Sequence, residues 1–192
     1  MIPTISEFSY GFALTNELID IAAEPLKVAP VFPSLVEEGR TGGGYDVNLD
    51  VPGFPLFIQF KRSDCLTKSN TREIEAGAPL TVPYYRFPIT ARARSNQHDM
   101  LCDLDNGVNE VFYAAPRFHE VEELNQAYLD NAVADRTFYI RPRDIGKFPD
   151  DDVHHVAFDN RRHFICSQPR EVKAIIGRPI FEEFLNKLKN DD

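Results

Sequence analysis

The sequence contains no apolar run of the roughly 18–20 residues that a transmembrane helix needs. Its start, Met1-Ile2-Pro3-Thr4, also lacks the basic and then apolar pattern of a secretory signal, so we expect neither a targeting peptide nor a membrane partner. The 3 cysteines, Cys65, Cys102 and Cys166, are far apart and form no CxxC pair. These absences predict a reduced, cytoplasmic protein.

Two kinds of site are also missing. Neither GxxxxGK[ST] nor GxGxxG occurs, and the glycines at 42–44 precede an expected strand rather than opening a helix, which is the wrong context for a phosphate-binding loop. The sequence places none of the cysteines in a context that would activate a thiol nucleophile. Nucleotide binding by such a loop and cysteine catalysis are therefore disfavoured.

Positive charge is scarce, with 21 lysines and arginines against 30 acidic residues and a net charge of −9. This balance argues against non-specific binding of nucleic acid by the whole surface. The distribution is uneven, however: residues 1–60 hold 2 basic and 8 acidic residues, whereas residues 61–98 hold 7 basic and 3 acidic residues. The basic stretch is either a chance cluster on a solvated face or a binding surface.

The 192 residues, 43% of them hydrophobic, predict one domain, 1–192, of mixed α/β class. Residues 62–95 show no clear periodicity. Elsewhere, cap residues and alternation predict helices over 15–24, 34–38, 95–105, 119–134 and 180–192, strands over 45–51, 54–62, 109–118 and 136–142, and a hairpin of 154–159 with 163–167. Ser34 and Glu37 form the S-x-x-E pattern of a capping box, and Pro52-Gly53 forms a turn.

One stretch, TGGGYDVNLDVPGFPLFIQFKRSD, carries unexpected polar residues on an apolar strand. Gln59 and Lys61 point to the same face, because side chains alternate with period two along a strand. Either that face meets solvent, or the two side chains do chemistry beside Asp46. Phe57 lies one step earlier on the same face, so the face is apolar there and the second interpretation is favoured.

An antiparallel pair of strands can bring Asp46 opposite Gln59 and Lys61. A carboxylate, an amide oxygen and the carbonyl of Phe60 are ligands that suit a hard cation such as Mg²⁺. The ammonium of Lys61 could position a water and stabilise developing negative charge. Together these groups fit metal-assisted phosphodiester hydrolysis.

This stretch resembles the core motif of the PD-(D/E)XK nuclease superfamily, with Asp46 as the first acid and Gln59-Phe60-Lys61 in place of (D/E)-x-K. Glu37 or Glu38 matches the upstream acid on the preceding helix. The family usually has Glu or Asp where this chain has Gln59, and the resemblance implies that an amide oxygen can still bind metal there. The resemblance covers about residues 34–116. It implies a restriction-endonuclease-like core, which is a central mixed sheet flanked by helices, with residues 117–192 as a C-terminal decoration.

The resemblance implies a Mg²⁺- or Mn²⁺-dependent DNA endonuclease, in which a partner subunit or a homo-oligomer assists the acidic chain in capturing DNA, as in a defence or mobile-element system. Asp46, Gln59 and Lys61 would be catalytic, and Asp46, Gln59, Glu38 and Glu37 would be metal ligands. The alternative is a non-catalytic interaction protein that keeps the nuclease-like fold and binds a partner through its acidic surface. The candidate nucleic-acid-binding residues are Arg62, Lys68, Arg72, Arg92, Arg94 and Gln97.

Two further patterns leave alternatives open. Tyr84, Tyr85 and Phe87 precede Arg92 and Arg94, which is typical either of a groove that stacks bases or of a packed aromatic cluster. His163-x₂-Cys166, with a histidine at 154 or 155, has half the spacing of a zinc site, or else forms a polar hairpin face.

Overall fold

The structure is a computed structural model and describes residues 1–22, 26, 28–39, 42–51, 54–166 and 170–177. The helices are α1 (Glu7–Ile21), α2 (Leu35–Glu38), α3 (Arg72–Glu75), α4 (Gln97–Leu104), α5 (Val121–Leu129) and α6 (Pro142–Ile145). The strands are β1 (Val47–Val51), β2 (Phe54–Phe60), β3 (Asp64–Leu66), β4 (Tyr84–Ile89), β5 (Glu110–Pro116), β6 (Thr137–Ile140), β7 (His154–Phe158), β8 (His163–Ile165), β9 (Arg170–Glu171) and β10 (Ile175–Ile176). Among these residues, no helix combines the length and apolar character needed to cross a bilayer.

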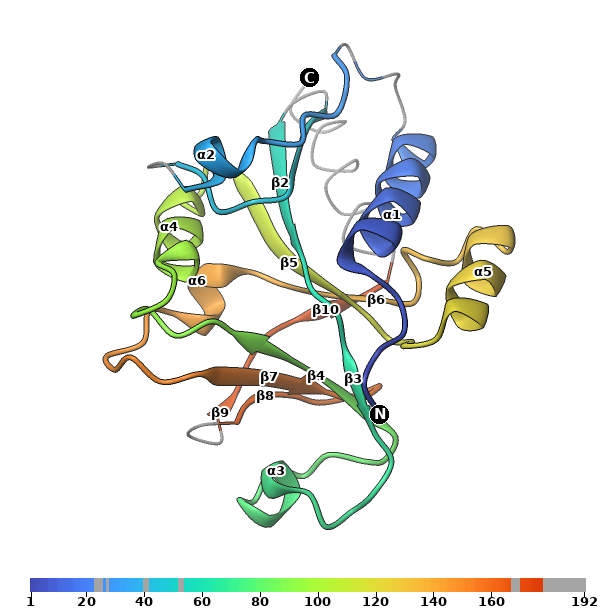
Figure 1. Cartoon of the computed structure of the whole chain (residues 1–192), viewed down its shortest axis with the longest axis vertical. Helices are drawn as coiled ribbons and strands as arrows, with labels where there is room; N and C mark the ends of the chain where they lie inside the picture. The colour runs from blue at the N-terminus through green and yellow to red at the C-terminus, as the bar shows by residue number, and fades with distance from the viewer. Residues whose placement is uncertain (23–25, 27, 40–41, 52–53, 167–169, 178–192) are drawn as a thin grey trace.

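The described strands form two five-stranded sheets, with the mixed α/β character that the sequence predicts (Figure 1). The first sheet has the order β1-β2-β5-β6-β10. Its β1 and β2 are antiparallel, and β2 runs parallel to β5. Because parallel neighbours need a crossover, the chain leaves β2 and returns through β3, β4 and α4 before it enters β5. The second sheet, β3-β4-β7-β8-β9, is antiparallel throughout.

The first sheet is buried on both faces. One face packs against α1 and α5, with Tyr10 and Leu14 of α1 fully buried. The other face packs against α4 and the second sheet, where Phe138 of β6 stacks on Phe158 of β7 with ring centroids 4.0 Å apart. The mixed sheet is flanked by helices as predicted, and a second sheet, which was not predicted, covers much of one face. The segment 62–95, which has no clear periodicity, supplies β3, α3 and β4 to this layer.

The first helix begins well before the expected start at residue 15. Ser6 caps α1 by accepting a hydrogen bond from the Ser9 N–H at 3.0 Å, so the helix runs from Glu7. Gly11 allows the helix to lie directly on β2, because a Cβ at this position would meet the ring of Phe60 at 2.6 Å. The glycine and the aromatic residues around it obscure the helical pattern in the sequence, yet the close approach is what requires the glycine.

Most other predicted elements are confirmed. Ser34 and Glu37 form the capping box, since the Ser34 N–H donates to the Glu37 carboxylate and the Glu37 N–H donates to Ser34 Oγ, each at 3.4 Å. The β1–β2 and β7–β8 hairpins have the predicted pairing. The helix expected over 119–134 ends at Leu129, because Asn131 takes a left-handed conformation with φ of 50°. The Pro52-Gly53 turn and the closing helix over 180–192 lie outside the described residues.

The C-terminal part of the chain is integrated into both sheets rather than added to them. β6 and β10 extend the first sheet beyond β5, and β7, β8 and β9 form most of the second. The backbone of Ile175-Ile176 pairs with Phe138 and Tyr139, so β10 forms the edge of the first sheet beside β6. The idea of residues 117–192 as a peripheral decoration is therefore wrong.

Candidate functional site

The β1–β2 hairpin places Asp46 beside the end of β2. The Asp46 N–H donates to the carbonyl of Ile58 at 2.9 Å, which continues the strand ladder one residue beyond β1. Its carboxylate oxygen Oδ2 accepts two hydrogen bonds of 2.7 Å, one from Nε2 of Gln59 and one from the N–H of Phe60. The register of the hairpin thus brings the carboxylate to the residues that the motif predicts.

Gln59 is buried, with only 3% of its surface exposed. It shares its face of β2 with Phe57, which packs into the core between the two sheets. The interpretation that this face meets solvent is therefore wrong at Gln59. Both N–H groups of its amide are used, because Nε2 also donates to the Phe60 carbonyl at 3.2 Å, and Oε1 accepts from Nε2 of Gln97 at 3.0 Å.

Lys61 contacts the same group of side chains through Gln97. Its Nζ donates to Oε1 of Gln97 at 3.3 Å and lies 5.6 Å from the centroid of the Tyr113 ring, within the range of a cation–π contact. We call Asp46, Gln59, Lys61, Gln97 and the backbone of Phe60 the Asp46 cluster. The cluster brings Gln59 into contact with Asp46, and Gln97, a candidate for nucleic-acid binding, joins Gln59 to Lys61.

Gly44 brings the loop before Asp46 against the start of α4. Its φ of +92° is a conformation that side chains with a Cβ rarely adopt. A Cβ there would lie 3.1 Å from the carbonyl of Gln97 and 3.3 Å from Cγ of Leu101. Gly44 therefore allows the loop before Asp46 to pack closely against α4, the helix that carries Gln97.

Replacing Gly44 by alanine is expected to lower the free energy of unfolding by about 1–3 kcal/mol, from left-handed strain and contact with α4 together. Gly42→Ala is the matched control, because Gly42 also has a positive φ, +85°, but its Cβ would meet nothing within 4 Å. Thermal unfolding of both variants separates the two causes. An equal loss of stability in both would contradict the packing role of Gly44.

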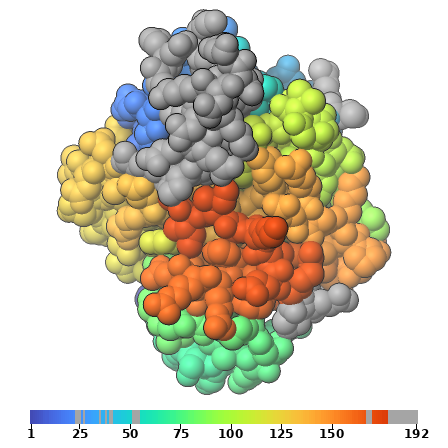
Figure 2. All heavy atoms as spheres, turned by 180° about the vertical axis from the view of Figure 1, so that it is seen from behind, coloured from blue at the N-terminus to red at the C-terminus, as the bar shows by residue number. Residues whose placement is uncertain are grey.

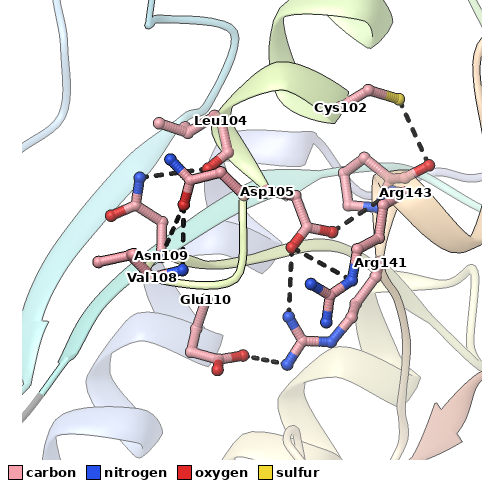
Figure 3. Close-up of polar contacts among 10 residues, drawn as sticks. Cys102, Leu104, Asp105, Val108, Asn109, Glu110, Arg141 and Arg143 are labelled. Carbon is pink, nitrogen blue, oxygen red and sulfur yellow. Dashed lines mark hydrogen bonds and ion pairs between the residues drawn. The ribbon is translucent and has the colours of Figure 1, made fainter.

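The other end of α4 is fixed by a buried ion network (Figure 3). The Asp105 carboxylate, whose side chain is 0% exposed, lies 3.3 Å from Nη1 of Arg141 and 3.6 Å from Nε of Arg143. Arg141 also pairs with Glu110 at the start of β5. Burial raises the pKa of Asp105, although both guanidinium groups oppose this shift. The network ties the end of α4 to β5 and α6, and so helps to orient the helix that carries Gln97.

Tyr113, which was not predicted from the sequence, supports the site together with His98, the neighbour of Gln97 on α4. The ring of Tyr113 lies under Lys61, and its hydroxyl is 3.0 Å from Nδ1 of His98, whose Nε2 is 2.9 Å from the carbonyl of Gly146. Burial lowers the pKa of His98, which favours the neutral ring at neutral pH. The available signal was the alternation along β5, which puts Val111, Tyr113 and Ala115 on the face that meets α4.

The donor atoms of the cluster fit a hard cation, with one departure from the expected ligand set. Two acceptor oxygens, Asp46 Oδ2 and the Phe60 carbonyl, converge on the Nε2 group of Gln59. A half-turn of this amide would offer its oxygen in place of the nitrogen. Within the described residues, no three His, Cys, Asp or Glu side chains form a metal-binding group, so any cation here depends on amide and main-chain oxygens.

Of the two candidate upstream acids, only Glu37 has a described side chain, and its contacts lie at the start of α2 rather than in the Asp46 cluster. The carboxylate of Glu37 is used in the cap of α2, where it accepts from the backbone and hydroxyl of Ser34. The Glu38 side chain lies outside the described residues. The assignment of Glu37 as a metal ligand therefore has no support from its position.

Five candidate nucleic-acid-binding residues lie outside the Asp46 cluster. Arg92 forms an ion pair of 3.1 Å with Asp151. Arg72 is the first residue of α3, which lies at the bottom of Figure 1, well away from α4. These side chains therefore do not all border the Asp46 cluster. The five, all exposed, are Arg62, Lys68, Arg72, Arg92 and Arg94.

The alternative sites gain no support. Burial raises the pKa of Cys102 and of Cys166 to about 12, which is the opposite of an activated thiol. Among the described residues, the histidines and cysteine of the β7–β8 hairpin form no three-ligand metal group. The aromatic residues of β4 pack inward, with Tyr84 and Phe87 fully buried, so the packed-cluster interpretation holds for these two.

Comparisons with protein-family models, with curated proteins and with solved structures found no match. The function of this chain is therefore inferred from the geometry of the Asp46 cluster itself.

Proposed function

We propose that this chain is a metal-dependent endonuclease that hydrolyses DNA phosphodiester bonds, with the Asp46 cluster as its active site and a restriction-endonuclease-like core. The supporting observation is that a carboxylate, a carboxamide, a main-chain carbonyl and an ammonium converge where β2 ends against α4. The parallel pairing of β2 with β5, with α4 in the connection, supports the proposed core.

Asp46, Gln59 and the Phe60 carbonyl would hold Mg²⁺ or Mn²⁺. When bound, such a cation polarises a phosphate oxygen and lowers the pKa of a coordinated water. The single carboxylate makes the site weaker than one with two, because each charge lost reduces the attraction for a divalent ion. We therefore expect cleavage to require a higher metal concentration than a two-carboxylate site would.

The chain's own groups prepare the site for an anionic substrate. Lys61 brings a positive charge that can stabilise the phosphate oxygens and orient the attacking water. Gln97 fixes Lys61 by accepting from its Nζ, and it fixes Gln59 by donating from its own amide. This positioning reduces the freedom of the two side chains before substrate binds.

DNA capture is proposed to depend on assistance. The net charge of −9 repels DNA, and the exposed basic residues of the stretch 61–98 do not all border the cluster. A partner subunit or a second copy of the chain would supply the missing positive surface. Such an arrangement would suit a component of a defence or mobile-element system.

The proposal is tested by plasmid cleavage with the full chain, alone and with any co-purifying subunit, in Mg²⁺, Mn²⁺ or EDTA. We expect metal-dependent nicking by the wild type and a loss of at least about 100-fold in Asp46→Asn, which removes the anionic charge from the metal site. Asp50→Asn, on the exposed side of β1, is the matched control and should cleave normally. A wild type that is inert in both metals would sink the enzyme proposal.

One observation favours the alternative, a non-catalytic interaction protein. The amide of Gln59 already satisfies Asp46 and the Phe60 carbonyl with hydrogen bonds of 2.7 and 3.2 Å, so the cluster is a stable polar network without a cation. This alternative predicts no cleavage and no change of melting temperature on addition of Mg²⁺ or Mn²⁺. It would assign the acidic surface to binding a basic protein partner.

A further inference from the structure

A second polar site lies beyond the end of β5, in an open cavity of about 550 Å³. Arg117, Arg136 and Arg161 line it, together with Tyr85 and Asp159. Figure 2 shows the face on which gold, orange and green surfaces meet; they contain α5, the β7–β8 hairpin and the segment before β4. We call this the arginine cavity. It shares no residue with the Asp46 cluster.

The fold itself brings two of the arginines together. The N–H of Arg117, just after β5, donates to the carbonyl of Arg136, just before β6, at 2.8 Å. Arg136 is held by an ion pair of 3.6 Å with Glu123, and its guanidinium carbon lies 5.0 Å from the centroid of the Phe118 ring. Arg161 reaches the same cavity from the turn between β7 and β8.

Positive charge in the cavity is incompletely compensated. One carboxylate oxygen of Asp159 accepts a hydrogen bond from the Thr81 N–H at 2.7 Å. The other accepts from the backbone N–H groups of Arg161 and Arg162 at 2.7 and 2.8 Å. This carboxylate therefore stabilises the turn through backbone groups. On an acidic chain, a cavity lined by three arginines and one such aspartate is a local site for an anion.

Arg117 is only partly buried and lines the cavity with its positive charge. Its Nε is buried and has no hydrogen-bond partner within the described residues. Burial lowers the pKa of Arg117, and the neighbouring charge of Arg136 lowers it further, while Tyr85 opposes the shift. Because the side chain is partly exposed there, its guanidinium charge is available to an anion bound in the cavity.

We propose that the arginine cavity binds the phosphate group of a small organic phosphate. Guanidinium groups match phosphate oxygens with paired, charge-assisted hydrogen bonds. Tyr85 gives the cavity an aromatic wall beside the arginines, which suits a ring attached to the phosphate. The volume lies within the range of roughly 300–1,000 Å³ that small-molecule sites usually have. The best probe is therefore a nucleoside monophosphate.

The test is calorimetric titration of the full chain with AMP, inorganic phosphate and adenosine, all in EDTA so that the result does not depend on the proposed nuclease activity. AMP and phosphate should bind, and adenosine should not. Arg117→Gln should weaken AMP binding at least about tenfold, and Arg161→Gln at least about threefold, because each removes a charge-assisted contact. Lys173→Gln, which removes an exposed charge outside the cavity, should bind as the wild type.

Arg161 is exposed in a turn, so its variant tests the proposal even if Arg117→Gln fails to fold. No binding of AMP or phosphate at millimolar concentration, equal binding of adenosine and AMP, or wild-type affinity in Arg161→Gln would each overturn the site. Oligonucleotides with a 5′-phosphate or a 5′-hydroxyl test whether the phosphate comes from the end of a nucleic-acid strand or from a free nucleotide. Tighter binding of the phosphorylated strand than of AMP identifies a strand end as the source, and the reverse order identifies a free nucleotide.

Discussion

Replacement of Lys61 by methionine is expected to reduce DNA cleavage by about 100- to 1,000-fold, the usual effect of removing one electrostatic group from an active site. Metal binding should change little, because Lys61 is not among the proposed ligands. Methionine keeps an unbranched side chain over the Tyr113 ring but loses the ammonium that donates to Gln97 at 3.3 Å. The cleavage rate of this variant should therefore fall while its affinity for the metal stays close to that of the wild type.

Single-turnover cleavage and the metal-dependent rise of melting temperature measure these two properties independently. Lys173→Met is the matched control, since it removes an exposed ammonium from outside the cluster. Lys61→Arg, which keeps the charge, should retain more activity than Lys61→Met. If Lys61→Met cleaves within about tenfold of the wild type, Lys61 provides little of the electrostatic stabilisation proposed here.

Replacement of Gln59 by glutamate is expected to destabilise the chain in EDTA and to make its stability depend on Mg²⁺. Gln59 is 3% exposed, and its Nε2 lies 2.7 Å from the Asp46 carboxylate. A carboxylate at this buried position would replace a hydrogen bond by repulsion from the partly buried carboxylate of Asp46. We expect a loss of about 2–4 kcal/mol in the free energy of unfolding at pH 7.5, and recovery of much of it on addition of Mg²⁺.

The chain supplies a close control for this substitution. Gln126 on α5 donates to the Asp130 carboxylate at 2.8 Å, but both side chains are exposed. Gln126→Glu creates the same pair of carboxylates in water, so its cost should stay below about 1 kcal/mol and should not respond to Mg²⁺. Equal behaviour of the two variants in thermal unfolding would contradict a cation-binding environment at Gln59.

The pH dependence of Gln59→Glu follows from the same contact. Two carboxylates in contact raise the pKa of one of them in the folded state above its unfolded value. The folded state then holds a proton that the unfolded state releases, so stability is highest at low pH and is lost as the pH rises through the folded pKa. Melting temperatures measured from acidic to neutral pH in EDTA should fall for this variant relative to the wild type.

Local patterns in the sequence predicted the hairpin and its polar face correctly. Alternation with period two puts Gln59 and Lys61 on one side at the end of β2, and the antiparallel pairing of β1 with β2 brings Asp46 beside Gln59. The capping box at Ser34 and the buried strand β5 follow from equally local signals. Such features depend on neighbours within a few residues, which is why sequence alone could predict them.

Features that depend on distant contacts were missed. The end of α5 was predicted too late because Asn131 takes a left-handed conformation, and the following segment is held by Glu17 of α1, which accepts from the Val133 N–H at 2.7 Å. Only the β7–β8 hairpin of the second sheet was predicted, because the strands of this sheet are short and come from widely separated segments. Tyr113 was missed because only packing against α4 and Lys61 gives it a role.

The sequence by itself therefore determined which residues stand on the same face of the hairpin, because strand periodicity is a property of the local backbone. Only the tertiary structure decided that this face is buried against α4 and that Gln97 joins Gln59 to Lys61. The arginine cavity likewise exists only where β5, β6 and the β7–β8 turn meet. These arrangements depend on contacts between segments far apart in the chain, and no local pattern contains them.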